Sequence, residues 1–194
     1  MNSLAGQFRI SFLVSGDKEN RGRIFDEIWR SYQQRIAVFV RYATRAEAGE
    51  VEDITQEIMI RVYRNLHRYN PIFSFNGWIY TLARNYCIDH LRKTSAGNNP
   101  RNRADNVDLD TVESTMPDPE QLLIDDQQAR FIGGFINSLE YRDRQAAFLR
   151  FYEGMSYKSI AGVLDIPVGT LKYRIHVIRQ NLKSAMKERD AIRT

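Results

Sequence analysis

The chain has 194 residues, of which 43% are hydrophobic, so it is long enough for two small domains, each with its own core. No apolar run approaches the length of a membrane span, and the segment 8–14 is too short and too polar at its flanks for a secretion signal; we expect a cytoplasmic protein. The net charge of +4 is unevenly spread, because cations gather at 84–103 and 172–193 and acids at 105–126, a pattern that suits a polyanionic partner.

The spacing of apolar residues is helical almost throughout, and no stretch alternates long enough to indicate a sheet. We therefore predict an all-α fold of two small helical domains. The predicted parts are an N-terminal tail (1–20) without an assigned role, a first helical domain (21–93), a polar linker (94–119) and a second helical domain (120–194). The linker is rich in Pro, Asn and Asp and has few large apolar residues, so it cannot bury enough surface to fold alone.

In the first domain, a wide apolar stripe over 24–40 predicts a scaffold helix. The next predicted helix, at about 51–69, has inward residues at Ile54, Ile58, Val62 and Leu66. This register leaves Asp53, Gln56 and Glu57 together on an exposed face. Taken alone, such a patch is most simply a solvated helix face.

A third predicted helix, at about 75–93, combines aromatic residues with cations. Single-stranded DNA is bound by aromatic rings that stack on bases and by cations that neutralise phosphates. The candidates for stacking are Phe73, Phe75, Trp78 and Tyr80. The alternative is that these rings fill the core of a three-helix unit. The single cysteine, Cys87, lies among apolar residues and is expected to be a core residue.

The segment 156–174 has the pattern of a helix-turn-helix. Ser156 can cap a short helix, a turn follows at 165–167, and Pro167 suits the start of a second helix. Asp165 stands where a left-handed backbone is expected and Gly is usual. Apolar residues at 171, 175, 178 and 182 turn the basic residues of the second helix outward, which is typical of a helix that reads the DNA major groove; the alternative is an ordinary solvated basic face.

In their order, these segments resemble the sigma-70 family of RNA polymerase sigma factors, in its small two-domain extracytoplasmic function (ECF) group. Asp53–Glu57 matches the family motif acidic-x-x-Gln-acidic, and 76–85 matches Trp-Leu-Tyr-x-Ile-Ala-x-Asn. Asp89–Arg92 matches Asp-x-Leu-Arg, and Pro167–Arg174 is similar to Pro-x-Gly-Thr-Val-Lys-Ser-Arg. The resemblance covers about 24–187.

The resemblance implies roles for individual residues. Docking on the clamp helices of the polymerase β′ subunit is implied for Asp53, Gln56 and Glu57. Capture of the melted minus-10 element, with a flipped base at the 70–77 loop, is implied for Phe73, Phe75, Trp78, Arg84, Asn85, Arg92 and Lys93. Reading of the minus-35 element is implied for Thr170, Lys172, Tyr173, Arg174, His176 and Arg179. Tyr173 departs from the pattern because Ser is usual there.

As partners the resemblance implies core RNA polymerase, including its β flap, promoter DNA and an anti-sigma factor. It implies that the linker threads towards the polymerase active-site and RNA-exit channels. We expect no enzymatic activity, cofactor or metal, since the sequence has no ligand spacing, phosphate loop or nucleophile–base signature and its three histidines are scattered. Two alternatives are a sigma-like decoy that binds an anti-sigma factor and a free-standing helix-turn-helix regulator.

Overall fold

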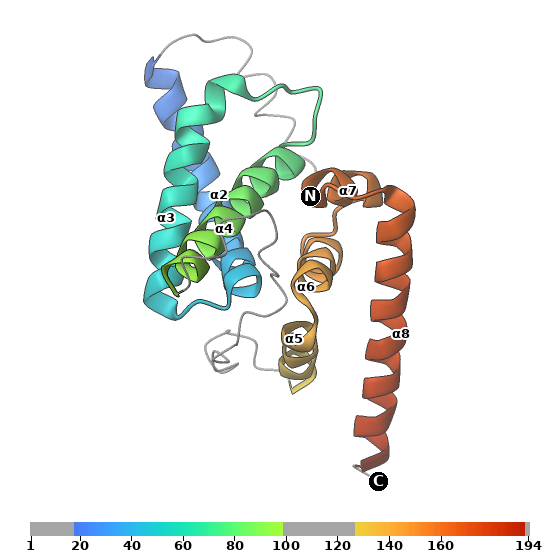
Figure 1. Cartoon of the computed structure of the whole chain (residues 1–194). Coiled ribbons are helices and arrows are strands. Elements are labelled where there is room, and N and C mark those ends of the chain that lie inside the picture. The colour runs from blue at the N-terminus through green and yellow to red at the C-terminus, as the bar shows by residue number, and fades with distance from the viewer. Residues whose placement is uncertain (1–17, 99–126, 193–194) are drawn as a thin grey trace. The chain divides into compact units, whose positions relative to one another are not determined.

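The computed structural model describes residues 18–98 and 127–192, and in these ranges every element is a helix, which confirms the predicted all-α fold. The chain divides near His90 into two compact units (Figure 1). The first unit contains α2 (Lys18–Thr44), α3 (Ala48–Asn65), the short 3-10 helix η1 (Leu66–Arg68) and most of α4 (Phe75–Asn98). Helix α4 extends five residues beyond the predicted end at Lys93, and the predicted linker from 99 onward lies outside the described residues.

The core of the first unit is a layer of aliphatic and aromatic side chains between α2, α3 and α4. Ile28, Ile36 and Phe39 of α2 are fully buried, as the apolar stripe predicts. Rings from α2 meet rings from α4 edge to face, for example Phe39 and Tyr80 with centroids 5.3 Å apart. The four predicted inward residues of α3 and η1 are also buried: Ile54, Ile58, Val62 and Leu66.

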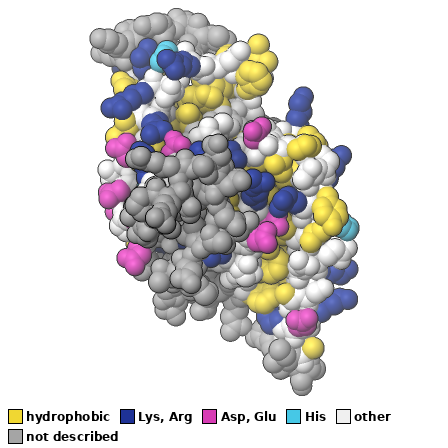
Figure 2. All heavy atoms as spheres, in the orientation of Figure 1, with side chains coloured by type: hydrophobic (Ala, Val, Ile, Leu, Met, Phe, Trp, Pro, Cys, Tyr) yellow, Lys and Arg dark blue, Asp and Glu magenta, His cyan; other side chains and the backbone are white. Residues whose placement is uncertain are grey.

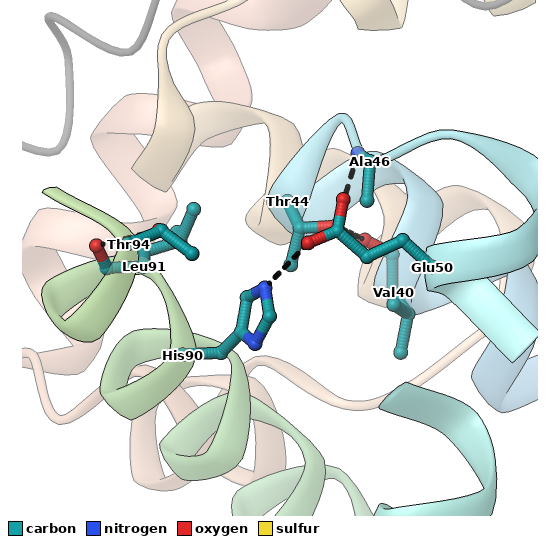
Figure 3. A network of polar contacts seen from close by, with 7 residues as sticks. All are labelled: Val40, Thr44, Ala46, Glu50, His90, Leu91 and Thr94. Carbon is teal, nitrogen blue, oxygen red and sulfur yellow. Dashed lines mark hydrogen bonds and ion pairs between the residues drawn. The ribbon is translucent and has the colours of Figure 1, made fainter. Parts of the chain in front are cut away.

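Polar contacts fix the corner between α2 and α3 and tie α3 to α4 (Figure 3). Thr44 donates to the carbonyl of Val40 at 2.8 Å and accepts from the amide of Ala46 at 3.2 Å, so it closes the end of α2. At the start of α3, Glu50 Oε1 lies 2.9 Å from Nε2 of His90, which belongs to α4. These contacts hold the exposed face of α3 in a fixed orientation relative to α4.

The second unit contains α5 (Gln127–Ser138), α6 (Tyr141–Ala147), the π-helical segment η3 (Phe148–Tyr152), α7 (Tyr157–Leu164) and the long α8 (Val168–Ile192). Helix α6 packs against α5, α7 and α8. The core is formed by fully buried residues of η3, α7 and α8, which include Phe148, Leu149, Ile160 and Leu171. Farther along α8, the guanidinium of Arg189 lies 4.6 Å from the ring centre of Phe131 in α5.

Candidate functional site

The exposed face of α3 is a continuous stripe. Asp53, Gln56 and Glu57 are all exposed, while the opposite side of the helix is buried in the core. One turn further, Ile60 keeps 38% of its surface exposed. The stripe therefore combines two carboxylates and an amide with an apolar side chain, which is a composition suited to a protein partner.

The loop that joins η1 to α4 presents two large apolar side chains to solvent. Ile72 is 81% exposed and Phe73 is 67% exposed. Three hydrogen bonds fix the loop: the amide of Ile72 donates to Oδ1 of Asn70 at 3.0 Å, the amide of Phe73 to the carbonyl of Asn70 at 3.1 Å, and the hydroxyl of Tyr69 to the carbonyl of Phe73 at 2.8 Å. The exposed side chains are thus held out by a preorganised turn.

The aromatic residues predicted to stack on DNA do not share one environment. Phe75 and Tyr80 are buried, with 3% and 0% of their surface exposed. The ring of Phe75 packs edge to face on Tyr69, with centroids 5.1 Å apart, and lies 5.4 Å from the ring of Trp78. Phe75 is therefore a core residue in this structure. Although it lies next to the exposed loop, its ring is buried against the rings of Tyr32, Tyr69 and Trp78. Phe73 is free to contact a ligand, whereas Ile72 was not among the predicted residues.

Helix α4 carries the remaining residues predicted for the minus-10 element. Trp78, Asn85 and Arg92 follow one another at intervals of two helical turns, so they lie along one side of α4. Trp78 is half-buried, and Asn85 and Arg92 are exposed. Lys93 is also exposed, and Arg84 is half-buried.

Two groups on α4 have raised pKa values because of their surroundings. Complete burial raises the pKa of the Cys87 thiol to about 12. Partial burial, helped by the negative charge of Glu57, raises the pKa of the Tyr86 phenol. The guanidinium of Arg61 lies 4.5 Å from the centre of the Tyr86 ring. Glu57 and Arg61 of α3 thus both lie near the middle of α4.

The helix-turn-helix has the predicted geometry. Oγ of Ser156 accepts from the amide of Ser159 at 3.1 Å and caps α7. Asp165 ends α7 with φ 53° and ψ 52°, the left-handed backbone expected at this position. The carbonyl of Pro167 accepts from the amide of Leu171 at 3.0 Å, so Pro167 immediately precedes the first residue of α8.

Most of the residues predicted to read the minus-35 element face solvent on α8. The exposed ones are Thr170, Lys172, Tyr173, His176 and Arg179, and Tyr173 reaches 70% exposure. Figure 2 shows Lys, Arg and His side chains along the outer side of this helix. Arg179 also lies over the ring of Phe151, 5.5 Å from its centre.

Arg174 is the exception among these residues. It is half-buried, and its Nη1 donates to Oδ1 of Asp143 in α6 at 2.7 Å. Sequence reasoning could not find Asp143, since it lies 31 residues away in a helix that carries no recognised motif.

Comparison with known proteins identifies two family segments. The family model for Sigma-70 region 2 matches residues 28–96, and the model for Sigma-70, region 4 matches residues 132–182. The matches lie in the first and the second unit respectively, apart from the last turns of α4. Among the described residues, no helix is long and apolar enough to span a membrane.

Similar proteins agree with these family matches. The ECF RNA polymerase sigma factor SigE of Mycolicibacterium smegmatis is 32% identical over 82% of this chain, which spans 60% of that relative's length. The ECF RNA polymerase sigma-E factor of Escherichia coli strain K12 is 28% identical over 95% of both chains.

Two solved structures have the same fold. The sigma factor RpoE in complex with the anti-sigma factor NepR from Bartonella quintana aligns with a TM-score of 0.65 at 20% identity, over 84% of this chain and 96% of that one. CnrH in complex with the cytosolic domain of CnrY aligns with a TM-score of 0.59 at 18% identity, over 95% and 96% of the two chains. Together with the two family matches and the sequence relatives, they lead to one conclusion: the chain belongs to the sigma-70 family of RNA polymerase sigma factors, in its extracytoplasmic function group.

Proposed function

We propose that this protein is a dissociable subunit of bacterial RNA polymerase that recognises promoters and promotes their melting, and that it catalyses no reaction itself. The observation that carries the proposal is the division of two kinds of surface between two units of a sigma-70 family chain. One unit has an acidic helix stripe and an exposed apolar loop, and the other has a basic helix-turn-helix.

Core polymerase binding falls to the stripe on α3. Asp53, Gln56 and Glu57 are presented side by side on a helix whose other face is anchored in the core. Ile60 supplies an apolar contact beside these polar groups, and buried apolar contacts surrounded by polar ones contribute most of the free energy in protein interfaces. We propose the clamp helices of the β′ subunit as the partner of this stripe, and the β flap as a partner of the second unit.

Contact with the melted minus-10 element falls to the loop before α4 and to one side of α4. Phe73 can stack on an extruded base, and Asn85, Arg92 and Lys93 lie along the helix that follows. Ile72 adds an apolar side chain that can insert at a base step and replace lost stacking. Sequence charge supports a polyanion here, because no Asp or Glu occurs between Glu57 and Asp89.

Recognition of the minus-35 element falls to the first turns of α8. The exposed Thr170, Lys172, Tyr173 and His176 occupy the N-terminal part of the second helix of the helix-turn-helix, which is the part that enters the major groove in this motif. Arg179 follows on the same helix and is suited to a phosphate contact.

We also propose control by an anti-sigma factor. The two solved relatives, RpoE and CnrH, were captured with NepR and with the cytosolic domain of CnrY. The same exposed surfaces are available in this chain for a protein that competes with polymerase. Since the proposed partners are polymerase and DNA, the cytoplasm is the proposed place of action.

Run-off transcription tests the proposal with purified core polymerase, this protein and a library of genomic promoter fragments. Specific initiation that depends on the added protein is the expected result. Core binding without initiation would favour a sigma-like decoy, and failure to bind core would favour a free-standing regulator.

A further inference from the structure

Arg174 sits in the second turn of α8 among residues that face solvent, yet its side chain turns towards α6. The side chain of Arg174 is 29% exposed and that of Asp143 is 23% exposed, with 2.7 Å between Nη1 and Oδ1. Lys172 and Tyr173, which precede it, are both exposed. The side chain of Arg174 therefore has a different environment from the side chains of Lys172 and Tyr173, although all three residues belong to one basic motif.

The position of the ion pair indicates what it does. Leu171 and Ile175, on either side of Arg174 in the sequence, are fully buried, and α8 packs on both α6 and α7. A guanidinium that reads guanine must point two parallel N–H groups at one base edge. Arg174 instead commits one terminal nitrogen to a partly buried carboxylate, and charge-assisted hydrogen bonds of this kind are short and directional.

We propose that Arg174 is a positioning residue, which sets the rotation and depth of α8 through its ion pair with Asp143, and that base discrimination in the minus-35 element falls to the exposed Thr170, Lys172, Tyr173 and His176. The proposal rests on the promoter-binding function proposed above. It assigns Asp143, a residue outside the helix-turn-helix, to promoter recognition.

The test uses reconstituted holoenzymes and a panel of promoters in which each minus-35 base pair is changed in turn. Asp143→Asn and Arg174→Ala should each lower promoter affinity by about three- to tenfold on every member of the panel, and the ranking of the promoters should stay the same. The double variant should be no weaker than either single variant, because both changes remove the same contact.

The conservative variant Arg174→Lys distinguishes a positioning role for Arg174 from direct reading of a base. Lys keeps a charge for Asp143 but cannot form the planar bidentate contact with a base, so near-normal affinity and an unchanged ranking are expected. The proposal is overturned if Arg174→Lys or Arg174→Ala loses discrimination at one base pair while Asp143→Asn keeps it.

Arg179 provides the matched control, since it is an exposed arginine on the same helix. Asp143→Asn combined with Arg179→Ala should have additive effects, in contrast to the pair with Arg174. The coupling between Asp143 and Arg174 can also be read from urea unfolding of the free protein. If the wild-type holoenzyme did not depend on the minus-35 element, the proposed function would fail, whereas a lack of coupling in unfolding would overturn the positioning role by itself.

Discussion

Asp165 ends α7 in a left-handed conformation, and this single residue sets the angle at which the chain enters α8. Its amide and that of Ile166 both donate to the carbonyl of Ala161, so the backbone of the turn is well satisfied. The side chain is exposed, and no packing requires an aspartate there. Asp tolerates the left-handed region better than most residues, but Gly adopts it without a steric cost.

Replacement of Asp165 by Gly should therefore stabilise the second unit by about 1 kcal/mol. Asp165→Ala is the matched comparison, and it should destabilise the unit because Ala tolerates this backbone less well than Asp. Urea unfolding of the two variants and the wild type measures the order of their free energies of unfolding. A glycine variant no more stable than the alanine variant would show that the turn is not strained.

Individual residues show where sequence reasoning reaches its limit. The cap at Ser156, the left-handed Asp165 and the start of α8 after Pro167 follow from local rules, and all three were predicted correctly. Phe75 and Arg174 were predicted to contact DNA, and each has a partner far along the chain, namely Tyr32 for Phe75 and Asp143 for Arg174. Such long-range partners leave no periodic signal in the sequence.

Helix α3 and the loop before α4 are the elements on which the proposed function of the first unit depends. The hydrophobic face of α3 was predictable from its period, and its exposed stripe followed as the complement of that face. The exposure of Ile72 was not predictable, because an apolar residue beside a proline is as compatible with a buried turn as with a projecting one. The hydrogen bonds of Asn70 and Tyr69 determine the outcome.

The triple variant Asp53→Ala, Gln56→Ala, Glu57→Ala should bind core polymerase at least about thirtyfold more weakly, because it removes the polar part of the docking stripe without disturbing the core of the unit. Titration of labelled protein with core enzyme measures the affinity.

The control is the variant Asp26→Ala, Glu27→Ala, Gln33→Ala, which removes the same three side-chain types from exposed positions of α2. It should bind core normally. Equal losses in the two triple variants would mean that net charge, and not the stripe, governs binding.

Ile72→Ser should slow promoter opening by about tenfold on duplex DNA, since the polar side chain gives no apolar contact to offset unstacking. On a template with a premelted minus-10 region the variant should initiate normally. Fluorescence of 2-aminopurine placed in the minus-10 element follows the opening step.

Ile60→Ser makes the same chemical change on α3 and should show no difference in its defect between duplex and premelted templates. If Ile72→Ser were equally impaired on both templates, Ile72 would act in binding of DNA or core and not in strand opening.

At the scale of the whole molecule, the contacts proposed for the two units lie on separate surfaces. The predicted fold of two helical domains is confirmed by the structure, and α4 continues to Asn98, five residues beyond its predicted end at Lys93. The last turn of α4 already has the polar composition of the linker, so composition alone places the start of the linker before the end of the helix.

Because the surfaces are separate, defects in the two units should be independent. The variant that combines Ile72→Ser with Lys172→Ala should reduce promoter opening by the product of the two single effects, within about 0.5 kcal/mol. Rates of open-complex formation for the four proteins give the comparison. A combined defect clearly smaller or larger than the product would mean that one unit senses the DNA contact of the other.

Burial of Cys87 has a practical consequence for measuring how the two units are arranged. The thiol is fully buried and its pKa is raised to about 12, so near neutral pH it is neither accessible to nor ionised for attack on a maleimide. A cysteine introduced at exposed Ile72 or Lys183 would then react selectively with a dye in an otherwise native chain. A pair of such dyes, one on each unit, would report the distance between the units before and after polymerase is bound.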